Sequence, residues 1–533
     1  MSQKKREEAF EGLFANVSKA PMVQGHQSLD QSPSDPPRLC GRAGNPHRGL
    51  IHSVHGSLEQ EDTFSLRDLL PEACGLAAAI NLPDASRYVY DCLMLQEHRG
   101  EHGAGIISYD GKEFAIRRRV GSVRENFHGV DIAGLLPGDI AVGHGRYATR
   151  GSVESATNVQ PLFFHASRFG PFAIAHNGQL ADPRGVRHRL VQQGILFQST
   201  TDSELFGHLI TQSFATNIED AIVDACRQIE VAYALLILCE DKIIALRDRF
   251  GVRPLSLGAM QGGFLVCSEN YAMDQYPDCK HLGDLAPGEM VILKRGSDTI
   301  RRIQYAKPDE HFCIFEGIYF SDPRTRYNGF WHEDFRYELG RLLAEENPDL
   351  EGDCIIPVLD SGKHAAVGLS EASGIPYREY FKRLHNPPRA KRRSFTSSTY
   401  EERVRTAYQK LHLRKEKIEG KRVIVVDDSI VRSTTIRIIN QRLRDAGAAS
   451  IINCVSAPAI VDICPYGMDF QDRQQLIAHH RTPQEICDLV GADRLLYVSL
   501  AGLERLIKNT YQCGICSGCF GGRYPLNGEG IER

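Results

Sequence analysis

Hydrophobic and polar residues are arranged differently in successive parts of this chain of 533 residues. Residues 1–73 show no sustained periodicity and are rich in Ser, Pro, Gly and Gln, so they cannot bury enough apolar surface to fold alone. We therefore expect a disordered leader or propeptide at residues 1–73. Glu7, Glu8 and Glu11 argue against an organellar transit peptide, because such peptides are poor in acidic residues.

Short apolar runs separated by turns containing Gly and Asp dominate residues 74–307 and predict a domain rich in β-strands. The clearest runs are Gly105–Tyr109, Phe172–His176, Ala234–Leu238 and Lys242–Leu246. From about Phe312, strand patterns alternate with helix patterns, which is typical of a parallel sheet with crossover helices. We place this second domain at residues 308–470, followed by a helical C-terminal tail with a cysteine cluster at residues 471–533.

The clearest strand and helix of the second domain lie next to each other in the sequence. The pattern predicts a strand at Arg422–Val426 and a helix at Thr434–Ala446, which ends before Gly447. The apolar face of this helix consists of Ile436, Ile439 and Leu443.

Composition and charge narrow the class of protein. The longest apolar stretch, Val231–Cys239, is far shorter than the roughly 20 residues that a membrane helix needs. The formal net charge of −4 gives no overall attraction to nucleic acid, although residues 388–393 are locally basic. The 15 cysteines follow no secretory signal, which suggests reduced thiols. We expect a cytoplasmic protein that binds neither membrane nor nucleic acid.

The turn after the strand at residues 423–426 combines groups that bind phosphate and ribose. It reads Asp427-Asp428-Ser429-Ile430-Val431-Arg432-Ser433-Thr434-Thr435. Backbone N–H groups at a turn and at a helix N-terminus form an anion site, to which hydroxyls of Ser429, Thr434 and Thr435 add donors. The two carboxylates can hold ribose hydroxyls and Mg²⁺. An Asp-Asp pair by itself is also compatible with a solvated turn before a capped helix.

The whole string resembles the phosphoribosylpyrophosphate (PRPP) binding motif of type I phosphoribosyltransferases. The resemblance implies that PRPP is bound by Asp427, Asp428, Ser429, Thr434 and Thr435. One departure is Ser433, where the family usually has a glycine that lets the backbone approach phosphate closely. Its side chain is expected to tilt the loop and weaken PRPP binding.

A second predicted strand, residues 355–359, ends in Asp360-Ser361-Gly362. In the family, a Pro-Asp-Ser or Pro-Asp-Thr element at this place joins the aspartate pair around Mg²⁺, which implies a magnesium site formed by Ser361, Asp427 and Asp428. Leu359 replaces the family's proline.

Residues 381–417 form a basic segment that resembles the family's flap over PRPP. Arg393 and Phe395 fit this flap, whereas Tyr400 and Tyr408 replace an expected Gln and Arg. The alternative is a solvated surface loop.

Five short motifs follow one another in the first domain. They are Glu72-Ala73-Cys74-Gly75-Leu76, His98-Arg99-Gly100, Gly143-His144-Gly145-Arg146-Tyr147-Ala148-Thr149, Ala175-His176-Asn177-Gly178 and Thr201-Asp202-Ser203-Glu204. In this order they resemble the glutamine amidotransferases with an N-terminal cysteine nucleophile. Taken singly, each has a structural explanation, such as a surface ion pair for Arg146 or a hairpin turn for Asn177-Gly178.

That resemblance implies a role for each residue of the glutamine site. Cys74 is the nucleophile, and Asn177 and Gly178 stabilise the oxyanion. Arg146 binds the substrate carboxylate and Asp202 binds its α-ammonium group. If the leader is removed before Cys74, the new α-amine, with an ordinary pKa of about 8, can act as base for the thiol. A misplaced start of the chain would explain the leader equally well.

The C-terminal tail contains Cys513, Cys516 and Cys519 at intervals of three residues. It resembles the iron–sulfur branch of the same amidotransferases, which implies a 4Fe-4S cluster bound by Cys464, Cys513 and Cys516. Tyr271 occupies the place of the fourth ligand, leaving Cys267, Cys279 or Cys519 as substitutes. A zinc ion and free thiols remain alternatives.

Both motif sets together, from Cys74 to about Pro525, resemble the glutamine PRPP amidotransferase family. The resemblance implies α+β and α/β architecture: an N-terminal-nucleophile αββα sandwich followed by a type I phosphoribosyltransferase domain with a parallel sheet. It implies an enzyme that makes 5-phosphoribosylamine from PRPP and glutamine, the first step of de novo purine synthesis. Further expectations are purine nucleotides as feedback ligands and a homo-oligomer, by resemblance a tetramer.

Two other functions stay open from the sequence alone. One is a regulatory paralogue that binds PRPP or nucleotide without turnover, which the substitutions at Ser433, Tyr400 and Tyr408 suggest. The other is a glutaminase that feeds a different acceptor.

Overall fold

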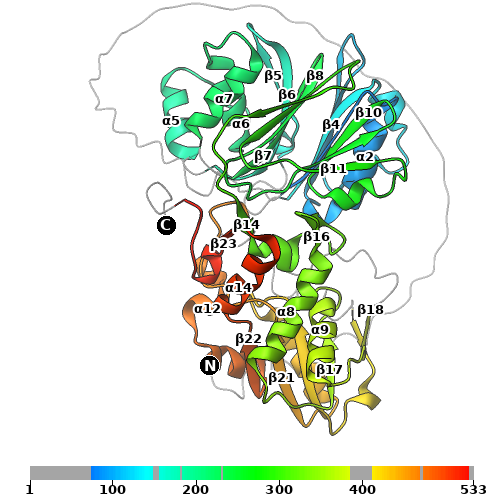
Figure 1. Ribbon diagram of the computed structural model, residues 1–533, viewed down its shortest axis with the longest axis vertical. Helices are drawn as coiled ribbons and strands as arrows, with labels where there is room; N and C mark the ends of the chain where they lie inside the picture. Colours follow the sequence, from blue (N-terminus) through cyan, green and yellow to red (C-terminus); the bar gives the residue numbers. More distant parts are fainter. Residues whose placement is uncertain are drawn as a thin grey trace, which may run out of the picture. The chain divides into compact units, whose positions relative to one another are not determined.

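Two antiparallel sheets lie between residues 75 and 304 of the computed structural model, which describes residues 74–147, 155–180, 183–229, 232–383, 411–468 and 472–526 (Figure 1). The seven-stranded sheet has the order β11-β9-β10-β1-β4-β2-β3, with β1 Gly75–Ile80, β2 Gly103–Tyr109, β3 Phe114–Val120, β4 Ile140–Arg146, β9 Ser256–Met260, β10 Gly263–Cys267 and β11 Lys280–Asp284. The six-stranded sheet has the order β13-β12-β8-β7-β6-β5, with β5 Leu162–Ala166, β6 Gly170–Gly178, β7 Tyr233–Cys239, β8 Lys242–Arg247, β12 Glu289–Lys294 and β13 Ile300–Gln304. All four strand-like runs predicted for this domain are strands.

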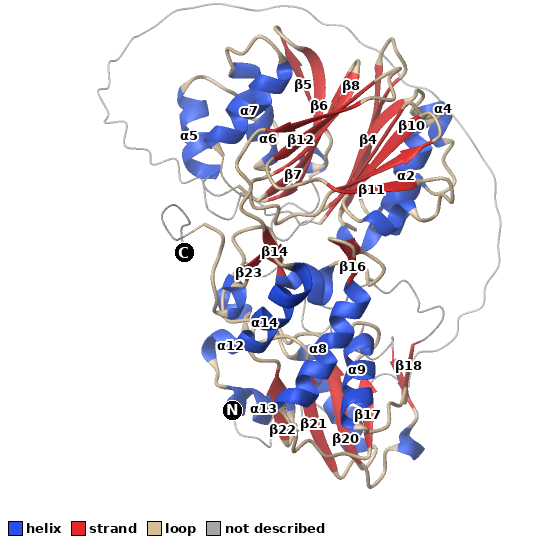
Figure 2. Ribbon diagram, in the orientation of Figure 1, coloured by secondary structure: helices blue, strands red, loops and turns tan. Residues whose placement is uncertain are grey.

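Helices cover the outer faces of both sheets, and apolar side chains fill the space between the sheets (Figure 2). Helix α2 packs on β1 and β4 of one sheet, and α6 and α7 pack on the other. The helices are α2 Ala85–Leu95, α3 Val123–Phe127, α4 Ile132–Leu135, α5 Pro183–Gln192, α6 Ser203–Gln212 and α7 Ile218–Gln228. The order helix, sheet, sheet, helix confirms the predicted αββα sandwich.

A four-stranded parallel sheet forms the centre of the C-terminal half, in the order β17-β20-β21-β22. Its strands are β17 Cys354–Pro357, β20 Arg422–Asp427, β21 Ser450–Val455 and β22 Arg494–Tyr497. The helices are α8 His332–Glu346, α9 Lys363–Ser373, α11 Thr434–Asp445, α12 Ile477–His480, α13 Pro483–Val490 and α14 Leu500–Tyr511. This arrangement confirms the predicted parallel-sheet domain.

The predicted strand and helix around the PRPP motif are β20 and α11. Ile436, Ile439 and Leu443 are buried as the pattern predicts. Strand β22 differs from the expectation, because it lies in the stretch beyond residue 470 that was predicted to be a helical tail. Its four residues are too few to show a periodicity, and pairing with β21 is what makes them a strand.

Three short strand pairs complete the described structure. Two join neighbouring segments: β15 Arg326–Tyr327 with β16 Phe330–Trp331, and β18 Phe381–Arg383 with β19 Leu411–Leu413. The third joins β14 His311–Cys313 to β23 Gly514–Cys516 in parallel, and thus connects the tail to the segment between the two domains.

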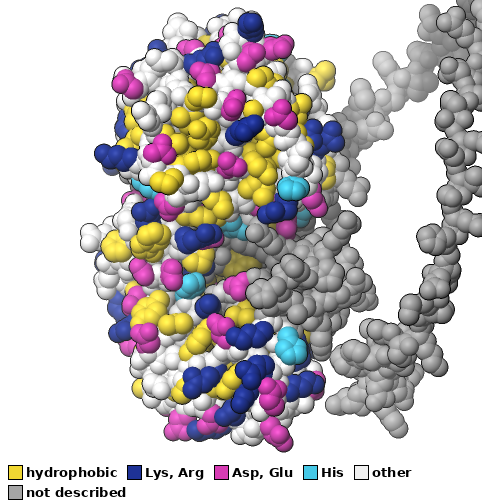
Figure 3. Space-filling view, turned by 90° about the vertical axis from the view of Figure 1, so that its right-hand side faces the viewer, with side chains coloured by type: hydrophobic (Ala, Val, Ile, Leu, Met, Phe, Trp, Pro, Cys, Tyr) yellow, Lys and Arg dark blue, Asp and Glu magenta, His cyan; other side chains and the backbone are white. Residues whose placement is uncertain are grey.

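On the face shown in Figure 3, basic and acidic side chains are interspersed rather than separated by sign. This face therefore creates no extended field of one charge. Among the described residues, no helix has the length and apolar character needed to cross a membrane.

Candidate functional site

Cys74 lies directly before β1 and is completely buried. Its backbone nitrogen donates a hydrogen bond of 3.0 Å to Oδ1 of Asn177. Gly75 pairs with Gly145 in the antiparallel register of β1 and β4, so Cys74 lies beside the end of β4, where Arg146 is. The first and third predicted motifs are therefore neighbours in space.

Asn177 and Gly178 end strand β6 and have the properties of an oxyanion site. Nδ2 of Asn177 is buried and has no hydrogen-bond partner among the described residues. Gly178 has a φ of +144°, and a Cβ there would lie 1.8 Å from the carbonyl oxygen of Ala232. Because any side chain would collide with backbone, only glycine fits beside Asn177.

Arg146 and Asp202 are both buried, at the end of β4 and directly before α6. Oδ2 of Asp202 accepts a hydrogen bond of 3.0 Å from the backbone nitrogen of Leu180. Oδ1 of Asp202 lies 3.9 Å from Nδ1 of His176, the residue before Asn177. Asp202 thus lies next to Asn177 and Gly178, while Ala148 and Thr149 of the Arg146 motif lie outside the described residues.

Two buried histidines join the sheets at this site. Nε2 of His144 and the carbonyl oxygen of His176 are 3.1 Å apart, which connects β4 to β6. Burial lowers the pKa of each imidazole to about 3, so both are neutral at cellular pH. A neutral His144 can donate Nε2–H to that carbonyl.

Arg99 makes a contact with Cys74 that the sequence did not predict. Its Nε donates a hydrogen bond of 3.2 Å to the carbonyl oxygen of Cys74. Its two terminal nitrogens donate bonds of 2.6 Å to Glu269 and 2.7 Å to Glu316. The motif His98-Arg99-Gly100 indicated that this segment belongs to the site, but it did not indicate what Arg99 contacts, because both glutamates are distant in sequence.

The same network reaches the second domain through Glu316, which begins the short helix Glu316–Phe320. NH1 of Arg253 donates a bond of 3.1 Å to Glu316, and its Nε donates one of 3.1 Å to the carbonyl oxygen of Tyr466. Burial alone would raise the pKa of Glu316, but Arg99 and Arg253 together bring it below its ordinary value. Glu316 is therefore a buried carboxylate anion held by two arginines.

The carboxyl ends of β17 and β20 bring the elements of the predicted PRPP site together. The two strands are parallel neighbours, and the backbone nitrogen of Val358 donates a bond of 2.8 Å to the carbonyl oxygen of Val426. A Cβ at Gly362 would lie 2.2 Å from that same oxygen. The loop that carries Ser361 therefore packs closely against the end of β20, where Asp427 begins the PRPP motif.

Asp427 and Asp428 are both buried at the end of β20. Oδ1 of Asp428 accepts a bond of 2.6 Å from the hydroxyl of Ser429. Burial, and then the charge of Asp428, raise the pKa of Asp427 well above its ordinary value. Two adjacent buried carboxylates are stable as anions only with a cation, so this pair fits Mg²⁺ held jointly with substrate phosphates.

Thr434 and Thr435 form the first turn of α11, as the motif predicts. Ser433 precedes them in the left-handed conformation, with φ 63° and ψ −8°. Glycine adopts this conformation freely, whereas a side chain there costs about 1 kcal/mol or more. Ser433, which replaces the family's usual glycine, thus occupies a position whose backbone conformation favours glycine.

Strands β18 and β19 pair at the two ends of the predicted flap. Arg393, Phe395, Tyr400 and Tyr408 lie outside the described residues.

The tail cysteines group differently from the predicted set. Cys516 lies opposite Cys313 in the pairing of β23 with β14, and the carbonyl oxygen of Cys519 accepts a bond of 2.9 Å from the backbone nitrogen of Val461. Cys464 lies three residues after Val461 in the sequence. After burial, which is the largest cause, the charges of Cys464, Cys516 and Cys313 raise the pKa of Cys519 further. Cys313, Cys464 and Cys516 thus all act electrostatically on Cys519.

Cys513, a predicted ligand, and two of the candidate substitutes, Cys267 and Cys279, have different neighbours. Burial and Glu310 raise the pKa of Cys513 to about 11, and no cysteine contributes to this shift. Cys267 interacts with Cys92 and Cys279 instead. The hydroxyl of Tyr271, at the family's fourth ligand position, donates to the carbonyl oxygen of Leu95.

Within the described residues, no three His, Cys, Asp or Glu side chains converge on one metal-ion position. Sulfurs around a 4Fe-4S cluster are spaced more widely than the ligands of a single ion. The group formed by Cys313, Cys464, Cys516 and Cys519 supplies the four thiols that such a cluster requires.

Known proteins resemble this chain over most of its length. A family described as a glutamine amidotransferase domain matches residues 144–275. The amidophosphoribosyltransferase of Bacillus subtilis is 36% identical over 86% of this chain and 94% of its own length. That of Methanocaldococcus jannaschii is 34% identical over 83% of this chain and 95% of its own length.

Solved structures give the same result. Glutamine PRPP amidotransferase from B. subtilis, complexed with ADP and GMP, has a TM-score of 0.77 at 35% identity and covers 85% of this chain and 97% of its own. A structure described as the allosteric regulatory enzyme of purine biosynthesis has a TM-score of 0.78, also at 35% identity.

Proposed function

This chain belongs to the amidophosphoribosyltransferase family, and on that premise we propose how its own residues carry out the reaction. The family's activity is the transfer of ammonia from glutamine to PRPP, which makes 5-phosphoribosylamine for purine synthesis. The chain is thus a glycosyltransferase with two reacting centres. The observation that carries the assignment of residues is the contact between Cys74 and Asn177.

At the glutamine site, the Cys74 thiolate attacks the side-chain carbonyl carbon of glutamine, the C–N bond breaks with release of ammonia, and water then hydrolyses the thioester to glutamate. Nδ2 of Asn177 and the backbone N–H of Gly178 donate to the oxyanion that forms. Arg146 binds the carboxylate of glutamine and Asp202 its α-ammonium group. Support comes from the burial of all these groups around Cys74 and from the absence of a described partner for Asn177 Nδ2.

The Cys74 α-amine is the base for its own thiol, which requires Cys74 to be the first residue of the active chain. Residues 1–73, which lie outside the described residues, are then absent from the active chain. Oδ1 of Asn177 orients the nitrogen of Cys74 in either form, because an amide and an amine both donate hydrogen bonds. Arg99 fixes the neighbouring carbonyl group.

At the PRPP site, Asp427 and Asp428 bind the ribose hydroxyls, and the first turn of α11 binds the 5-phosphate through Thr434 and Thr435. Ser429 adds a hydroxyl donor. Ser361, Asp427 and Asp428 would hold Mg²⁺, which neutralises pyrophosphate charge when bound. The raised pKa of Asp427 supports a cation at this position.

Cys313, Cys464, Cys516 and Cys519 are the proposed ligands of a 4Fe-4S cluster, with Cys519 and Cys313 in place of Cys513 and the family's fourth ligand. The parallel pairing of Cys313 with Cys516 supports this choice. When bound, the cluster would cross-link the tail to the segment that joins the two domains.

We further propose that purine nucleotides are feedback ligands, since a relative's structure is complexed with ADP and GMP. We also propose that the protein is a homotetramer located in the cytoplasm. A regulatory paralogue without turnover is the second candidate function. The observation that favours it is the left-handed backbone of Ser433 within the PRPP motif.

A glutamine analogue that carries a diazoketone tests the glutamine site directly. It alkylates a thiol that attacks its carbonyl region, so we expect one label per active chain, at Cys74. Intact-mass measurement of the active enzyme before labelling should give a chain that begins at Cys74. Label on another cysteine, or full activity in a chain that retains residues 1–73, would contradict the assignment.

A further inference from the structure

The middle of the PRPP motif is bound by a segment that comes much later in the sequence. Residues 430–433 form this part of the motif, which we call the PRPP loop. Residues 472–480 form the second segment, which we call the strap. The strap consists of a short 3₁₀ helix, Arg473–Gln475, followed by α12 (Figure 1). No motif in the sequence indicated a role for the strap.

The backbone of the PRPP loop is hydrogen-bonded to the strap. The backbone nitrogen of Ile477 donates a hydrogen bond of 3.0 Å to the carbonyl oxygen of Val431. Leu476 and Ile477 are buried in the same apolar core as Ile430. The strap therefore fixes the loop two residues before Ser433.

A side-chain contact fixes the next residue of the loop. Nε of Arg432 donates a bond of 2.8 Å to Oε1 of Gln475, 43 positions later. Nε2 of Gln475 donates one of 3.2 Å to Oδ2 of Asp472. A guanidinium group only donates hydrogen bonds and a carboxylate only accepts them, so one orientation of the amide satisfies both partners. The Gln475 amide is thus held between Asp472 and Arg432, although its side chain is exposed.

The backbone of Ser433 explains why the loop needs this support. Its left-handed conformation, with φ 63°, is unfavourable for any residue with a side chain. Such a conformation persists only where the surrounding structure holds it. On one side α11 does so, because the backbone nitrogen of Arg437 donates a bond of 3.0 Å to the carbonyl oxygen of Ser433. On the other side, the strap holds Val431 and Arg432.

The strap is itself attached at both ends to the segment that follows β21. Nε of Arg473 donates a bond of 2.8 Å to Oδ1 of Asp462. Nδ1 of His479 and the carbonyl oxygen of Val461 are 2.6 Å apart. The position of Gln475, between these two attachments, is therefore set independently of the PRPP loop.

We propose that Gln475 is a positioning residue of the PRPP site, which holds the PRPP loop in the conformation that binds the 5-phosphate. Backbone N–H groups of a loop and a helix N-terminus bind phosphate well only when they converge on one position, so a displaced loop loses affinity. The inference rests on the proposed function, because it takes the motif from Asp427 to Thr435 as the PRPP site. Gln475 acts through Arg432 and Ser433 and need not touch the substrate.

The test measures the KM for PRPP with ammonia as the nitrogen donor, so that the glutamine site is not involved. Gln475→Met keeps the length of the side chain and removes the amide. We expect it to raise the KM about three-fold, the effect of one lost hydrogen bond to a charged group, and to leave kcat at saturating PRPP within about 1.5-fold of wild type. Gln475→Ser is a second variant that should give the same result.

A double-mutant cycle with Ser433→Gly separates positioning from a general structural role. Glycine adopts the left-handed conformation without help from its surroundings. In the Ser433→Gly background, Gln475→Met should therefore change the KM by less than about 1.5-fold. A loss of stability unrelated to the loop would raise the KM equally in both backgrounds.

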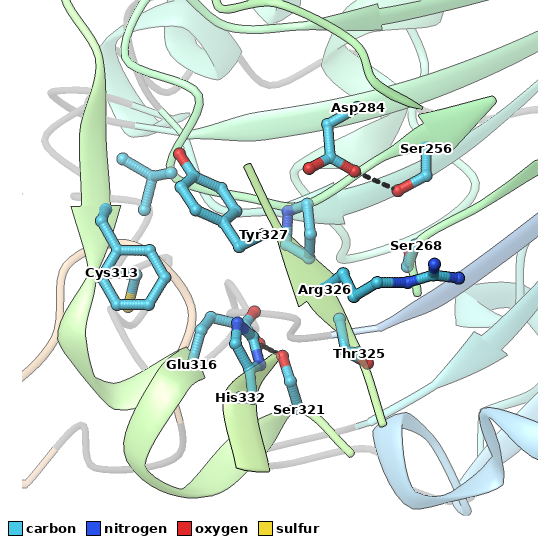
Figure 4. Close-up of a pocket in the computed structure, with 13 residues that line it drawn as sticks. Ser256, Ser268, Asp284, Cys313, Glu316, Ser321, Thr325, Arg326, Tyr327 and His332 are labelled. Carbon is cyan, nitrogen blue, oxygen red and sulfur yellow. Dashed lines mark hydrogen bonds between the residues drawn. The ribbon is translucent and has the colours of Figure 1, made fainter. Parts of the chain in front are cut away.

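Two control variants should keep the wild-type KM. Gln474→Met changes the neighbouring exposed residue, whose backbone nitrogen donates to Asp472. Ser256→Ala removes the hydroxyl that donates a hydrogen bond to Asp284 in the glutamine domain (Figure 4). If any lost hydrogen bond raised the KM for PRPP, Ser256→Ala would raise it too.

Equilibrium binding of PRPP in the presence of Mg²⁺ repeats the comparison without turnover. An unchanged KM and Kd in both Gln475 variants, or the same increase with Ser433 and with Gly at position 433, would overturn the inference. A wild-type chain that binds PRPP but releases no pyrophosphate would refute the proposed function, while the Kd values would still decide the role of Gln475. A wild-type chain that binds no PRPP would overturn both.

Discussion

The backbone nitrogen of Cys74 donates a hydrogen bond of 3.0 Å to Oδ1 of Asn177, although the two residues are 103 positions apart. The amide of Asn177 therefore has its oxygen occupied by the nucleophile's own nitrogen and its Nδ2 directed elsewhere in a buried site. One side chain can thus position the nucleophile and stabilise the charge that the attack creates. In the proposed reaction, Cys74 and Asn177 therefore act together.

We predict that Cys74→Ala abolishes glutamine-dependent formation of pyrophosphate but leaves the activity with high ammonia. The physical reason is that the PRPP site needs only the amine, whichever way it arrives. Steady-state pyrophosphate release with each nitrogen donor checks this prediction. Cys239→Ala, a buried cysteine of the same domain outside the site, is the control and should keep both activities. Equal loss with both donors in Cys74→Ala would contradict the separation of the sites.

The double substitution Asp427→Asn with Asp428→Asn should remove PRPP turnover, because neutral amides cannot replace carboxylates that bind ribose and Mg²⁺. Hydrolysis of glutamine should survive in part. Equilibrium binding of PRPP in the presence of Mg²⁺ is the measurement. The matched control, Asp445→Asn with Asp488→Asn, changes two exposed carboxylates, one on α11 and one on α13, and should bind PRPP normally. An unchanged PRPP affinity in the first variant would remove these residues from the site.

Ser433→Gly should relieve the left-handed backbone at φ 63° and let the loop approach phosphate more closely. We expect a gain in stability of about 1 kcal/mol and a KM for PRPP about five-fold lower. Gln512→Gly is the control, because Gln512 also has a positive φ, of 54°, but lies outside the PRPP motif. It should raise stability without changing the KM. Identical KM values for wild type and Ser433→Gly would show that the serine does not limit PRPP binding.

Acid should destabilise the protein through its buried histidines. The pKa of His144 is about 3 in the fold and ordinarily 6.5, so the unfolded chain binds a proton more tightly. The contribution of neutral His144 to the free energy of unfolding is therefore fully present above pH 6.5. It decreases as the pH falls towards 3, by up to about 1.4 kcal/mol per pH unit for each such histidine. His144→Gln, which keeps a donor for the His176 carbonyl, should reduce this slope. Urea unfolding at pH 7 and pH 5.5 measures it, and an unchanged slope would show that His144 is not the group that titrates.

Local sequence patterns were sufficient for much of the fold. The short apolar runs of β2, β6, β7 and β8 and the apolar face of α11 were readable because each depends on neighbouring residues. Both sites were also readable as motifs, because their residues lie on short turns at strand ends, as in Asp427 to Thr435 and Asn177-Gly178.

What the sequence did not reveal depends on contacts between distant segments. The network of Arg99 with Glu269 and Glu316 spans 170 and 217 positions, and no local pattern encodes such pairing. The equal spacing of Cys513, Cys516 and Cys519 allows two overlapping pairs. They are distinguished by the neighbours of Cys519, which include Cys313 and Cys464, both distant from it in sequence.

The most direct test of the whole account is steady-state pyrophosphate release by the purified chain, given PRPP, Mg²⁺ and glutamine. We predict continuous release that depends on all three, with one glutamate formed for each pyrophosphate. Glutamate formation without any pyrophosphate, or PRPP binding without turnover of either substrate, would contradict the account.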